Sequence, residues 1–262
     1  MVEAQAPVVI VTRPQREAQL WAMGLQGHGV RTEILPLIQI VPLPDTSPLK
    51  ALWDPLPQLL AVMFVSANAV RFFMAAKPAG MDLGICRAWS TGPGTQAALV
   101  ACGWPADQID SPPADASQFD SEALWHLVAS RVAAADPARV LIVRGADAEG
   151  FMAGRDWFAQ QLAQAGAQVL QAVAYVRQPP SLSDAQQQRA FQAVSDGSWW
   201  LFSSSEAAQH LVQVCPGLDL GRAQALATHP RIAQRLQQSG WGRVETVPAG
   251  LAAQADSIKS LT

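Results

Sequence analysis

The chain has 262 residues, of which 50% are hydrophobic and 15% are charged, and its formal net charge is −3 at pH 7. This composition excludes an intrinsically disordered protein and indicates a globular chain with one large domain or two small ones. The acidic balance and the lack of a basic tract argue against nucleic acid as a partner.

The cysteines and the start of the chain indicate a cytoplasmic protein. Cys86, Cys102 and Cys215 lie far apart without a CxxC pair, so we expect free thiols in a reducing compartment. The histidines show no metal-ligand spacing, and no metal site is expected. The opening run VVIVT lacks the basic region of a signal peptide, and no apolar run approaches the roughly 20 residues that cross a membrane.

Short apolar runs alternate with helical patterns along the whole chain. The run at 8–12 predicts a buried strand, and residues 15–27 follow as a helix in which Leu20, Met23 and Gly24 share a face. The pattern then predicts strands at 59–65, 140–145 and 168–177, helices at 68–76, 121–135 and 156–165, strand-turn-helix units at 87–104, 199–211 and 224–241, and a surface loop at 105–117. This alternation predicts parallel sheets with helices on both faces.

Three strand-turn-helix units occur twice in the same order. STGPGTQAALVACGW (90–104) aligns without a gap with ATHPRIAQRLQQSGW (227–241). FVSANAVRFF (64–73) matches FSSSEAAQHL (202–211), and VVIVTRP at the start matches VLIVRG from residue 140. These matches predict an internal duplication, whereas the alternative is that generic strand-turn-helix units resemble one another.

The expected domain boundaries do not lie at the midpoint of the chain, because residues 121–135 read as an uninterrupted helix. Linker composition occurs instead at 41–57 and 177–184, which are rich in Pro and Ser. We therefore expect a first α/β domain formed by residues 1–41 plus 178–262 and a second α/β domain, residues 42–177, inserted within it.

Several stretches in one fixed order resemble the uroporphyrinogen-III synthase family. They are VTRP (11–14), PLI (36–38), FVSANAVRFF (64–73), STGPGTQAAL (90–99), VLIVRG (140–145), GR (154–155), AYVR (174–177), FSSSEAA (202–208) and HPRIAQRLQQSGW (229–241). The resemblance covers almost the whole chain, although the segment at 146–153 is longer than the family pattern. It implies two flavodoxin-like parallel-sheet domains joined by a two-stranded connector, with the active site in the cleft between them.

The resemblance also implies a function. The chain would be a lyase of heme and porphyrin biosynthesis that cyclises the linear tetrapyrrole hydroxymethylbilane, inverts the last pyrrole ring and releases water. That chemistry requires no cofactor. The implied partners are the tetrapyrrole and, transiently, the deaminase that makes it, and the expected state is a monomer without membrane contact.

Two groups of residues are expected to hold the substrate carboxylates. Backbone N–H groups at helix N-termini favour anions, and the candidates there are Ser66, Asn68, Thr91, Gly92, Thr95, Ser203, Ser204 and His229. Arginine forks match carboxylates, and the candidates at strand ends and turns are Arg13, Arg144 with Gly145, Arg155, Arg177 and Arg231. The alternatives are ordinary helix capping for the first group and structural ion pairs for the second.

Tyr175 is the only tyrosine of the chain and the expected catalytic residue. A tyrosine at this place in the family is a candidate for aiding departure of the substrate hydroxyl, because a phenol donates a hydrogen bond at neutral pH. The alternative is a half-buried strand aromatic.

Two other functions compete with the cyclising enzyme. A non-catalytic two-domain cytosolic module that binds or senses a small anionic ligand would share the architecture. A flavodoxin-like electron carrier would need a phosphate-binding loop after the first strand, and TRPQRE does not resemble one.

Overall fold

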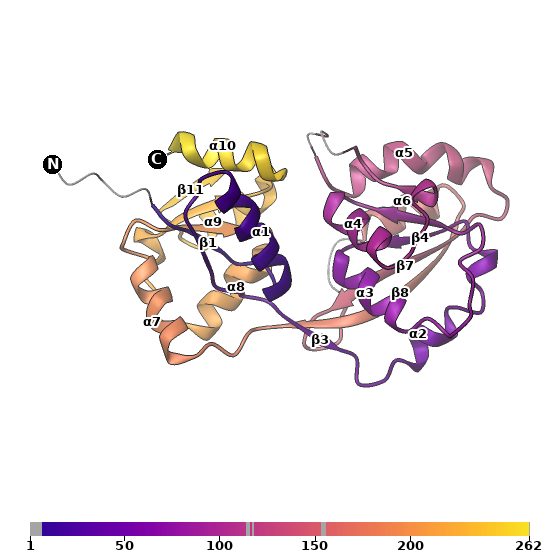
Figure 1. The fold of residues 1–262 in the computed structure, drawn as a ribbon, viewed down its shortest axis with the longest axis horizontal. Coiled ribbons are helices and arrows are strands. Elements are labelled where there is room, and N and C mark those ends of the chain that lie inside the picture. Colours follow the sequence, from indigo (N-terminus) through magenta and orange to yellow (C-terminus); the bar gives the residue numbers. More distant parts are fainter. Residues whose placement is uncertain (1–6, 114–115, 117, 153–155, 262) are drawn as a thin grey trace. The chain divides into compact units, whose positions relative to one another are not determined.

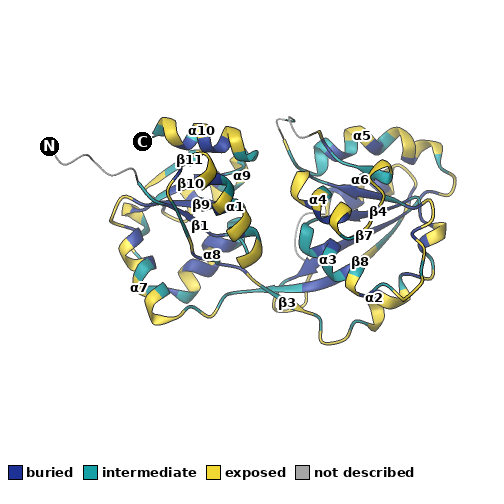
Figure 2. Cartoon of the chain, in the orientation of Figure 1, coloured by how far each residue is buried: buried dark blue, intermediate teal, exposed yellow. Residues whose placement is uncertain are grey.

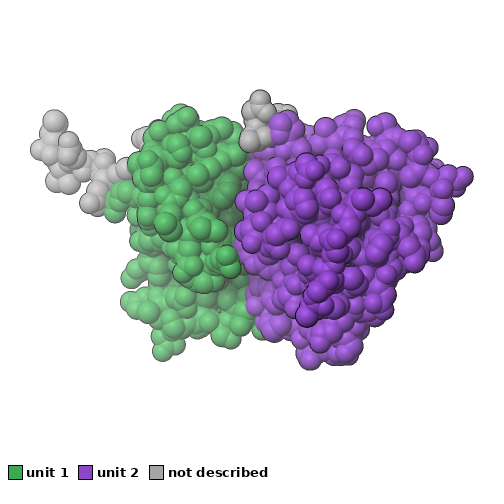
Figure 3. All heavy atoms as spheres, turned by 45° about the vertical axis from the view of Figure 1, so that its right-hand side comes forward, with its two compact units in different colours: residues 1–39, 178–262 green, residues 40–177 purple. Residues whose placement is uncertain are grey.

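The computed structural model describes residues 7–113, 116, 118–152 and 156–261 of the chain (Figure 1). Contacts between Cα atoms divide the chain into two compact units, drawn in green and purple in Figure 3. Unit 1 comprises residues 1–39 and 178–262, and unit 2 comprises residues 40–177. The predicted domains differ from these units only at residues 40 and 41, and independent folding of each domain stays a prediction.

Unit 1 contains a five-stranded sheet in the order β11-β10-β9-β1-β2. Its strands are β1 (Val9–Val11), β2 (Thr32–Ile34), β9 (Trp199–Phe202), β10 (Gln224–Ala227) and β11 (Arg243–Thr246). The pairings along this order are parallel. Every residue of β1 and β9 is buried, as expected for apolar runs covered by helices on both faces. Because both ends of the chain contribute strands, the first domain is discontinuous.

The helices of unit 1 include two that the sequence patterns did not indicate, α7 and α10. The helical elements of unit 1 are α1 (Gln15–Gly27), α7 (Asp184–Ala193), α8 (Ser205–Val214), α9 (Pro230–Gln238), α10 (Leu251–Leu261) and the 3₁₀ turn η3 (Leu220–Arg222). Of the expected shared face of Leu20, Met23 and Gly24, Gly24 alone is packed, because Leu20 is 60% and Met23 67% exposed. Small residues let α1 approach its neighbours instead: a Cβ on Gly24 would lie 2.5 Å from the Leu251 side chain of α10.

Unit 2 contains a six-stranded sheet in the order β3-β8-β7-β4-β5-β6. Its strands are β3 (Gln39–Pro42), β4 (Ala61–Phe64), β5 (Arg87–Ser90), β6 (Ile109–Asp110), β7 (Arg139–Ala146) and β8 (Gln168–Gln178). Strand β6 corrects the expectation of a surface loop at 105–117. It forms because the Asp110 carboxylate accepts hydrogen bonds from Arg87 and from the Trp89 indole on β5, at 2.6 and 2.9 Å.

Helices cover both faces of the unit 2 sheet (Figure 2), and the core on each face contains aromatic rings among aliphatic side chains. The helical elements are α2 (Ser47–Ala51), α3 (Ala67–Ala75), α4 (Pro93–Ala101), α5 (Ser121–Ala134), α6 (Trp157–Gln164) and the 3₁₀ turns η1 (Leu56–Gln58) and η2 (Ala106–Gln108). On one face, Trp53 stacks on Phe73 with ring centroids 4.6 Å apart. On the other face, Trp89 packs edge-on against Phe158. Such pairs stabilise a core beyond the area that they bury.

The two sheets share one strand order. In unit 1, β1 lies between β2 and β9, and β10 and β11 follow outward; in unit 2, β7 lies between β8 and β4, and β5 and β6 follow outward. This is the flavodoxin-like order, so the predicted fold class is confirmed. Strands β3 and β8, neighbours in one ladder, carry the chain from one unit to the other and form the predicted two-stranded connector.

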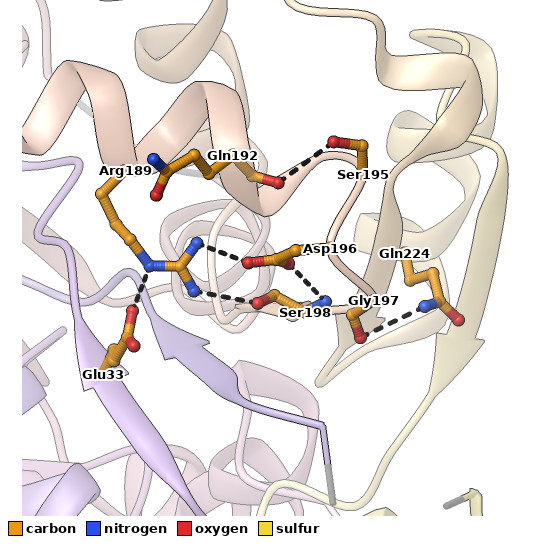
Figure 4. Close-up of polar contacts among 8 residues, drawn as sticks. All are labelled: Glu33, Arg189, Gln192, Ser195, Asp196, Gly197, Ser198 and Gln224. Carbon is orange, nitrogen blue, oxygen red and sulfur yellow. Dashed lines mark hydrogen bonds and ion pairs between the residues drawn. The ribbon is translucent and has the colours of Figure 1, made fainter. Parts of the chain in front are cut away.

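A closed polar cluster fastens α7 to the amino ends of the unit 1 strands (Figure 4). The Arg189 guanidinium donates to Glu33 on β2, to Asp196 at 2.9 Å and to Ser198 at 3.0 Å. Asp196 also accepts from the backbone N–H of Ser198. Because each of the three guanidinium nitrogens of Arg189 contacts a partner within the unit, we assign this cluster a structural role.

The cysteines are free thiols, and two of them are buried. Burial raises the pKa of Cys86 to about 12 and also raises the pKa of Cys215, so both thiols stay protonated at neutral pH. Within the described ranges, no helix has the length and apolar character needed to cross a membrane. The same ranges contain no group of three or more His, Cys, Asp or Glu placed to hold a metal ion.

Candidate functional site

The described candidate residues lie at the carboxyl ends of neighbouring parallel strands, the edge at which open α/β sheets bind ligands. In unit 1, Arg13 follows β1, Ser203 and Ser204 follow β9, and His229 and Arg231 follow β10. In unit 2, Ser66 and Asn68 follow β4, Thr91, Gly92 and Thr95 follow β5, Arg144 and Gly145 lie near the end of β7, and Tyr175 and Arg177 near the end of β8. Arg155 lies outside the described residues.

A hydroxyl pair occupies the carboxyl edge of unit 2. The Tyr175 hydroxyl lies 2.9 Å from the Ser66 Oγ, within hydrogen-bond distance. Ser66 is the N-cap of α3, and its Oγ accepts from the backbone N–H of Ala69 at 3.2 Å. Tyr175 is only 2% exposed and its ring stacks on Phe72 at 5.8 Å, whereas Ser66 is half-buried. The serine therefore caps a helix and contacts the tyrosine at the same time.

Gly145 makes room for the tyrosine ring. The ladder between β7 and β8 is irregular after Arg144, and the shifted register places Gly145 opposite Tyr175. A Cβ on Gly145 would lie 2.6 and 2.7 Å from two ring carbons of Tyr175. Any side chain at this position would displace the ring, so the glycine supports the hydroxyl pair by its small size.

Arg144 is buried and forms an ion pair. Its side chain is 3% exposed, and its Nη1 lies 2.9 Å from Asp156, whose side chain is 62% exposed. The following turn is ordered by Asp147, whose carboxylate accepts from the backbone N–H of Phe151 at 2.8 Å. In this state the ion-pair alternative describes Arg144, and a carboxylate ligand would compete with Asp156 for the same guanidinium.

Capping explains part of the helix N-termini. Ser66 caps α3, Ser204 caps α8 through the N–H of Glu206, and the Nδ1 of His229 caps α9 through the N–H of Arg231. The capping alternative thus holds for these three residues, and each cap still leaves N–H groups in the first turn for a ligand.

Helix α4 begins differently from the other three. Its N-cap is Gly92, which has no side chain to accept from the first turn. Ser90, fully buried at the end of β5, fixes the approach by donating to the Gly92 carbonyl at 3.1 Å. Thr95 is buried in the first turn, and Thr91 is half-buried. The backbone at this N-terminus therefore has an anion-favouring dipole without a side-chain cap.

Arg13 occupies the corresponding edge of unit 1. Its guanidinium carbon lies 4.1 Å from the centroid of the Trp21 ring on α1. Burial lowers the pKa of Arg13 to about 10, and the charge of Glu17 opposes this shift, so the side chain stays cationic at neutral pH. The Trp21 indole donates to Gln254 of α10, which holds the ring in place.

Arg13 and Arg144 occupy equivalent positions in the two sheets. In unit 1, Val11 pairs with Leu201, the residue before Phe202; in unit 2, Ile142 pairs with Met63, the residue before the matched Phe64. Arg13 follows Val11 by two residues, and Arg144 follows Ile142 by two residues. The similarity between the repeated segments of the sequence therefore extends to the register of the strands.

Several residues that position the candidates were not among those expected from the sequence. Asp156, Ser90, Trp21 and Phe72 contact Arg144, the Gly92 turn, Arg13 and Tyr175, respectively. Ser90 and Phe72 lie in the repeated segments, whereas Asp156 and Trp21 carried no such signal. The remaining two described arginines differ in exposure: Arg177 is half-buried near the end of β8, and Arg231 is exposed in the first turn of α9.

A family model described as uroporphyrinogen-III synthase HemD matches residues 19–250. The chain belongs to the uroporphyrinogen-III synthase family. Among solved structures, the uroporphyrinogen-III synthetase of Helicobacter pylori is 17% identical, with a TM-score of 0.59 and coverage of 98% of this chain and 100% of that chain. A mutant uroporphyrinogen III synthase of Thermus thermophilus is 17% identical, with a TM-score of 0.57 and coverage of 97% and 98%. At these identities the likeness shows a shared fold.

Membership of this family makes the chain a tetrapyrrole-cyclising enzyme, a lyase of heme and porphyrin biosynthesis. Its substrate is a tetrapyrrole. The alternative of a non-catalytic binding or sensing module is not favoured.

Proposed function

We propose that this uroporphyrinogen-III synthase converts hydroxymethylbilane to the ring-inverted cyclic product through residues at the carboxyl edges of its two sheets. The observation that carries the proposal is the family match over residues 19–250. The site residues are an inference from their position at edges that bind ligands in open α/β sheets.

In this proposal the protein binds anions and limits the paths open to a reactive intermediate. Helix N-termini after β4, β5, β9 and β10 bind substrate carboxylates through backbone N–H groups. Arg13, Arg144, Arg155, Arg177 and Arg231 add positive charge to a protein whose net charge is −3. The electron-rich pyrrole expels the hydroxyl, and the protein holds the resulting azafulvene for attack from the correct ring position.

The Tyr175 hydroxyl assists departure of the substrate hydroxyl. Its pairing with Ser66 at 2.9 Å supports this role, because a hydroxyl pair that is held in place needs no reorganisation as the C–O bond breaks. Loss of Tyr175 should slow the reaction without abolishing it, since the pyrrole can expel water unaided.

We also infer a monomer that acts in the cytoplasm and receives its substrate in transient contact with the deaminase that makes it. The buried free thiols of Cys86 and Cys215 suit a reducing compartment. An unstable substrate favours a short path between the two enzymes. Light scattering of the purified chain, alone and mixed with the deaminase, tests both the monomer and the contact.

The test of function is an isomer assay. A deaminase generates hydroxymethylbilane in place, this chain is added, and the oxidised type I and type III uroporphyrins are separated by chromatography. Predominant type III product is expected. Type I product at the spontaneous rate, from protein with a cooperative unfolding transition, would contradict the proposal and return the anion-binding module to consideration.

A further inference from the structure

The hydroxyl pair on unit 2 assigns different roles to its two members. Ser66 Oγ can accept two hydrogen bonds and donate one. The Ala69 N–H takes one acceptor position at 3.2 Å, and the Tyr175 hydroxyl lies at 2.9 Å. The question is which hydroxyl donates to the other, because the donor in that bond cannot donate the same proton to a ligand.

Acidity and burial both favour Tyr175 as the donor. A phenol, with an ordinary pKa near 10, is a much stronger hydrogen-bond donor than an aliphatic alcohol, and its delocalised oxygen is the poorer acceptor. Tyr175 is 2% exposed, with its ring between Phe72 and the backbone at Gly145, while Ser66 is half-buried. The serine is thus the member of the pair that a ligand at this edge would meet.

We propose that Ser66 is the catalytic hydroxyl that contacts the substrate, and that Tyr175 is a positioning residue that acts through it. If Ala69 and Tyr175 fill both acceptor positions of Ser66, the proton of Ser66 is left for a ligand or for water. The inference rests on the proposed function, since the group that receives this proton is the departing hydroxyl of hydroxymethylbilane.

The proton balance of the step follows from this order. The C–O bond breaks and its electron pair leaves with the oxygen, while the pyrrole electrons form the new double bond of the azafulvene. The leaving oxygen takes the Ser66 proton, while Tyr175 keeps its own proton and its hydrogen bond stabilises the charge that develops on Ser66 Oγ. The proton released by the pyrrole nitrogen returns to Ser66, so the products are the azafulvene and water and the protein is unchanged.

A double-mutant cycle separates this arrangement from independent roles. Ser66→Ala is expected to lower kcat by roughly 100-fold, the usual range for a general acid, with little change in KM. Tyr175→Phe keeps the ring that fills the space beside Gly145 and is expected to lower kcat by about tenfold, the value of one hydrogen bond. The double variant should match Ser66→Ala alone, and Ser66→Thr should restore most of the activity.

The matched control is Ser183→Ala. Ser183 caps α7 as Ser66 caps α3, so this variant loses a serine N-cap without touching the hydroxyl pair. It should unfold at a lower denaturant concentration, as Ser66→Ala does, but keep the wild-type kcat. Losses that multiply in the double variant would overturn the proposal, because Tyr175 would then contact the substrate on its own. A Ser66→Ala variant with wild-type kcat would overturn it as well.

A readout independent of activity uses the single tyrosine of the chain. Labelling with 13Cζ-tyrosine gives one NMR resonance. Ser66→Ala should shift this resonance, and Ser183→Ala should leave it in place. An unchanged resonance in Ser66→Ala would show that the bond is absent and overturn the proposal. If the wild-type protein forms type III product but the losses of kcat in Ser66→Ala and Tyr175→Phe multiply in the double variant, only this inference fails. If the wild-type protein forms no type III product, both this inference and the proposed function fail.

Discussion

The carboxyl edges of the two units carry the same residue types in the same register but fix them differently. In unit 1, Arg13 after β1 stacks on Trp21, whereas in unit 2 the equivalent Arg144, near the end of β7, pairs with Asp156. Ser66, the N-cap after β4 in unit 2, contacts the Tyr175 hydroxyl. For Ser204, the N-cap after β9 in unit 1, the sequence offers no second tyrosine that could make an equivalent contact. The two edges therefore present similar residue types, and among the described contacts a serine–tyrosine hydroxyl pair occurs in unit 2 alone.

The largest expected effect comes from adding a single methyl group at Gly145, beside the hydroxyl pair of unit 2. Gly145→Ala places a Cβ 2.6 Å from the Tyr175 ring, so the ring must move and the hydroxyl pair separates. We expect a loss of about 1–3 kcal/mol in the free energy of unfolding and a more than tenfold loss of kcat. Urea unfolding and the isomer assay measure the two effects.

Gly27→Ala is the control for that change, because a Cβ at the end of α1 would meet nothing within 4 Å. It should be neutral or stabilising by up to about 1 kcal/mol and leave kcat unchanged. A fully active Gly145→Ala variant would show that the position of the Tyr175 ring does not matter for the reaction.

The second effect concerns the arginine of the same edge. Arg144→Ala removes a charged hydrogen-bond donor, and KM should rise by roughly tenfold or more. Asp156→Asn should lower KM instead, because the substrate carboxylate no longer competes with Asp156 for the guanidinium. Steady-state kinetics of the two variants measure these opposite changes.

Arg139, at the other end of strand β7, gives the control for Arg144. It donates to Gln58 at 2.7 Å and lies at the amino edge, away from the candidate residues of unit 2. Arg139→Ala should leave KM unchanged. If the KM is also unchanged in Asp156→Asn, Arg144 forms a structural ion pair and does not bind substrate.

The third effect separates stability from catalysis at the amino edge of unit 1. Arg189→Ala removes the contacts to Glu33, Asp196 and Ser198 that fasten α7. The free energy of unfolding should fall by about 1–2 kcal/mol, with kcat and KM unchanged. Lys259→Ala, which removes an exposed pair with Asp256, should have a smaller effect by the same measurement, because solvent screens the pair. A change of KM in Arg189→Ala would contradict the structural role of the cluster.

The smallest effect is a pH dependence in the same cluster. Burial alone would raise the pKa of Asp196, but hydrogen bonds from Ser198 and the charge of Arg189 together hold it below its usual value. A carboxyl with a lowered pKa stabilises the fold above its unfolded-state pKa, near 4, and this contribution disappears as the pH falls through the folded-state pKa.

Asp196→Asn should therefore differ most from the wild type near neutral pH, and the difference should shrink as the pH falls below about 4. Because the Asp196 side chain is 42% exposed, solvent screening limits the difference to less than about 1 kcal/mol. Urea unfolding at a series of pH values measures it. A difference that grows on acidification would contradict the assignment.

Much of the fold was predictable because it depends on local patterns. Apolar runs located the strands, and serine, threonine and glycine located the turns after them. Strand β6 escaped prediction because two residues carry no period, and their pairing depends on the Asp110 contacts to Arg87 and Trp89 on β5. The packed face of α1 was not predictable from its own sequence, because Gly24 meets Leu251 from the far end of the chain.

The candidate site was predictable as a set of positions but not as a set of contacts. Each turn is a local feature of the sequence, whereas Ser66 and Tyr175 are 109 residues apart and Trp21 and Gln254 are 233 apart. Such contacts depend on which strands become neighbours. The register shift that places Gly145 opposite Tyr175 likewise has no signature in the sequence of β7.

The shared strand order has a consequence for how the chain divides. The first copy of the repeat supplies β1, β2, β4, β5 and β6, and the second supplies β7 to β11, yet unit 1 takes β1 and β2 from the first copy and β9 to β11 from the second. Unit 2 combines the complementary strands. The repeat in the sequence and the folded unit thus have different boundaries: a chain cut between α5 and β7 contains no complete sheet in either piece, so each unit needs strands from both halves of the chain.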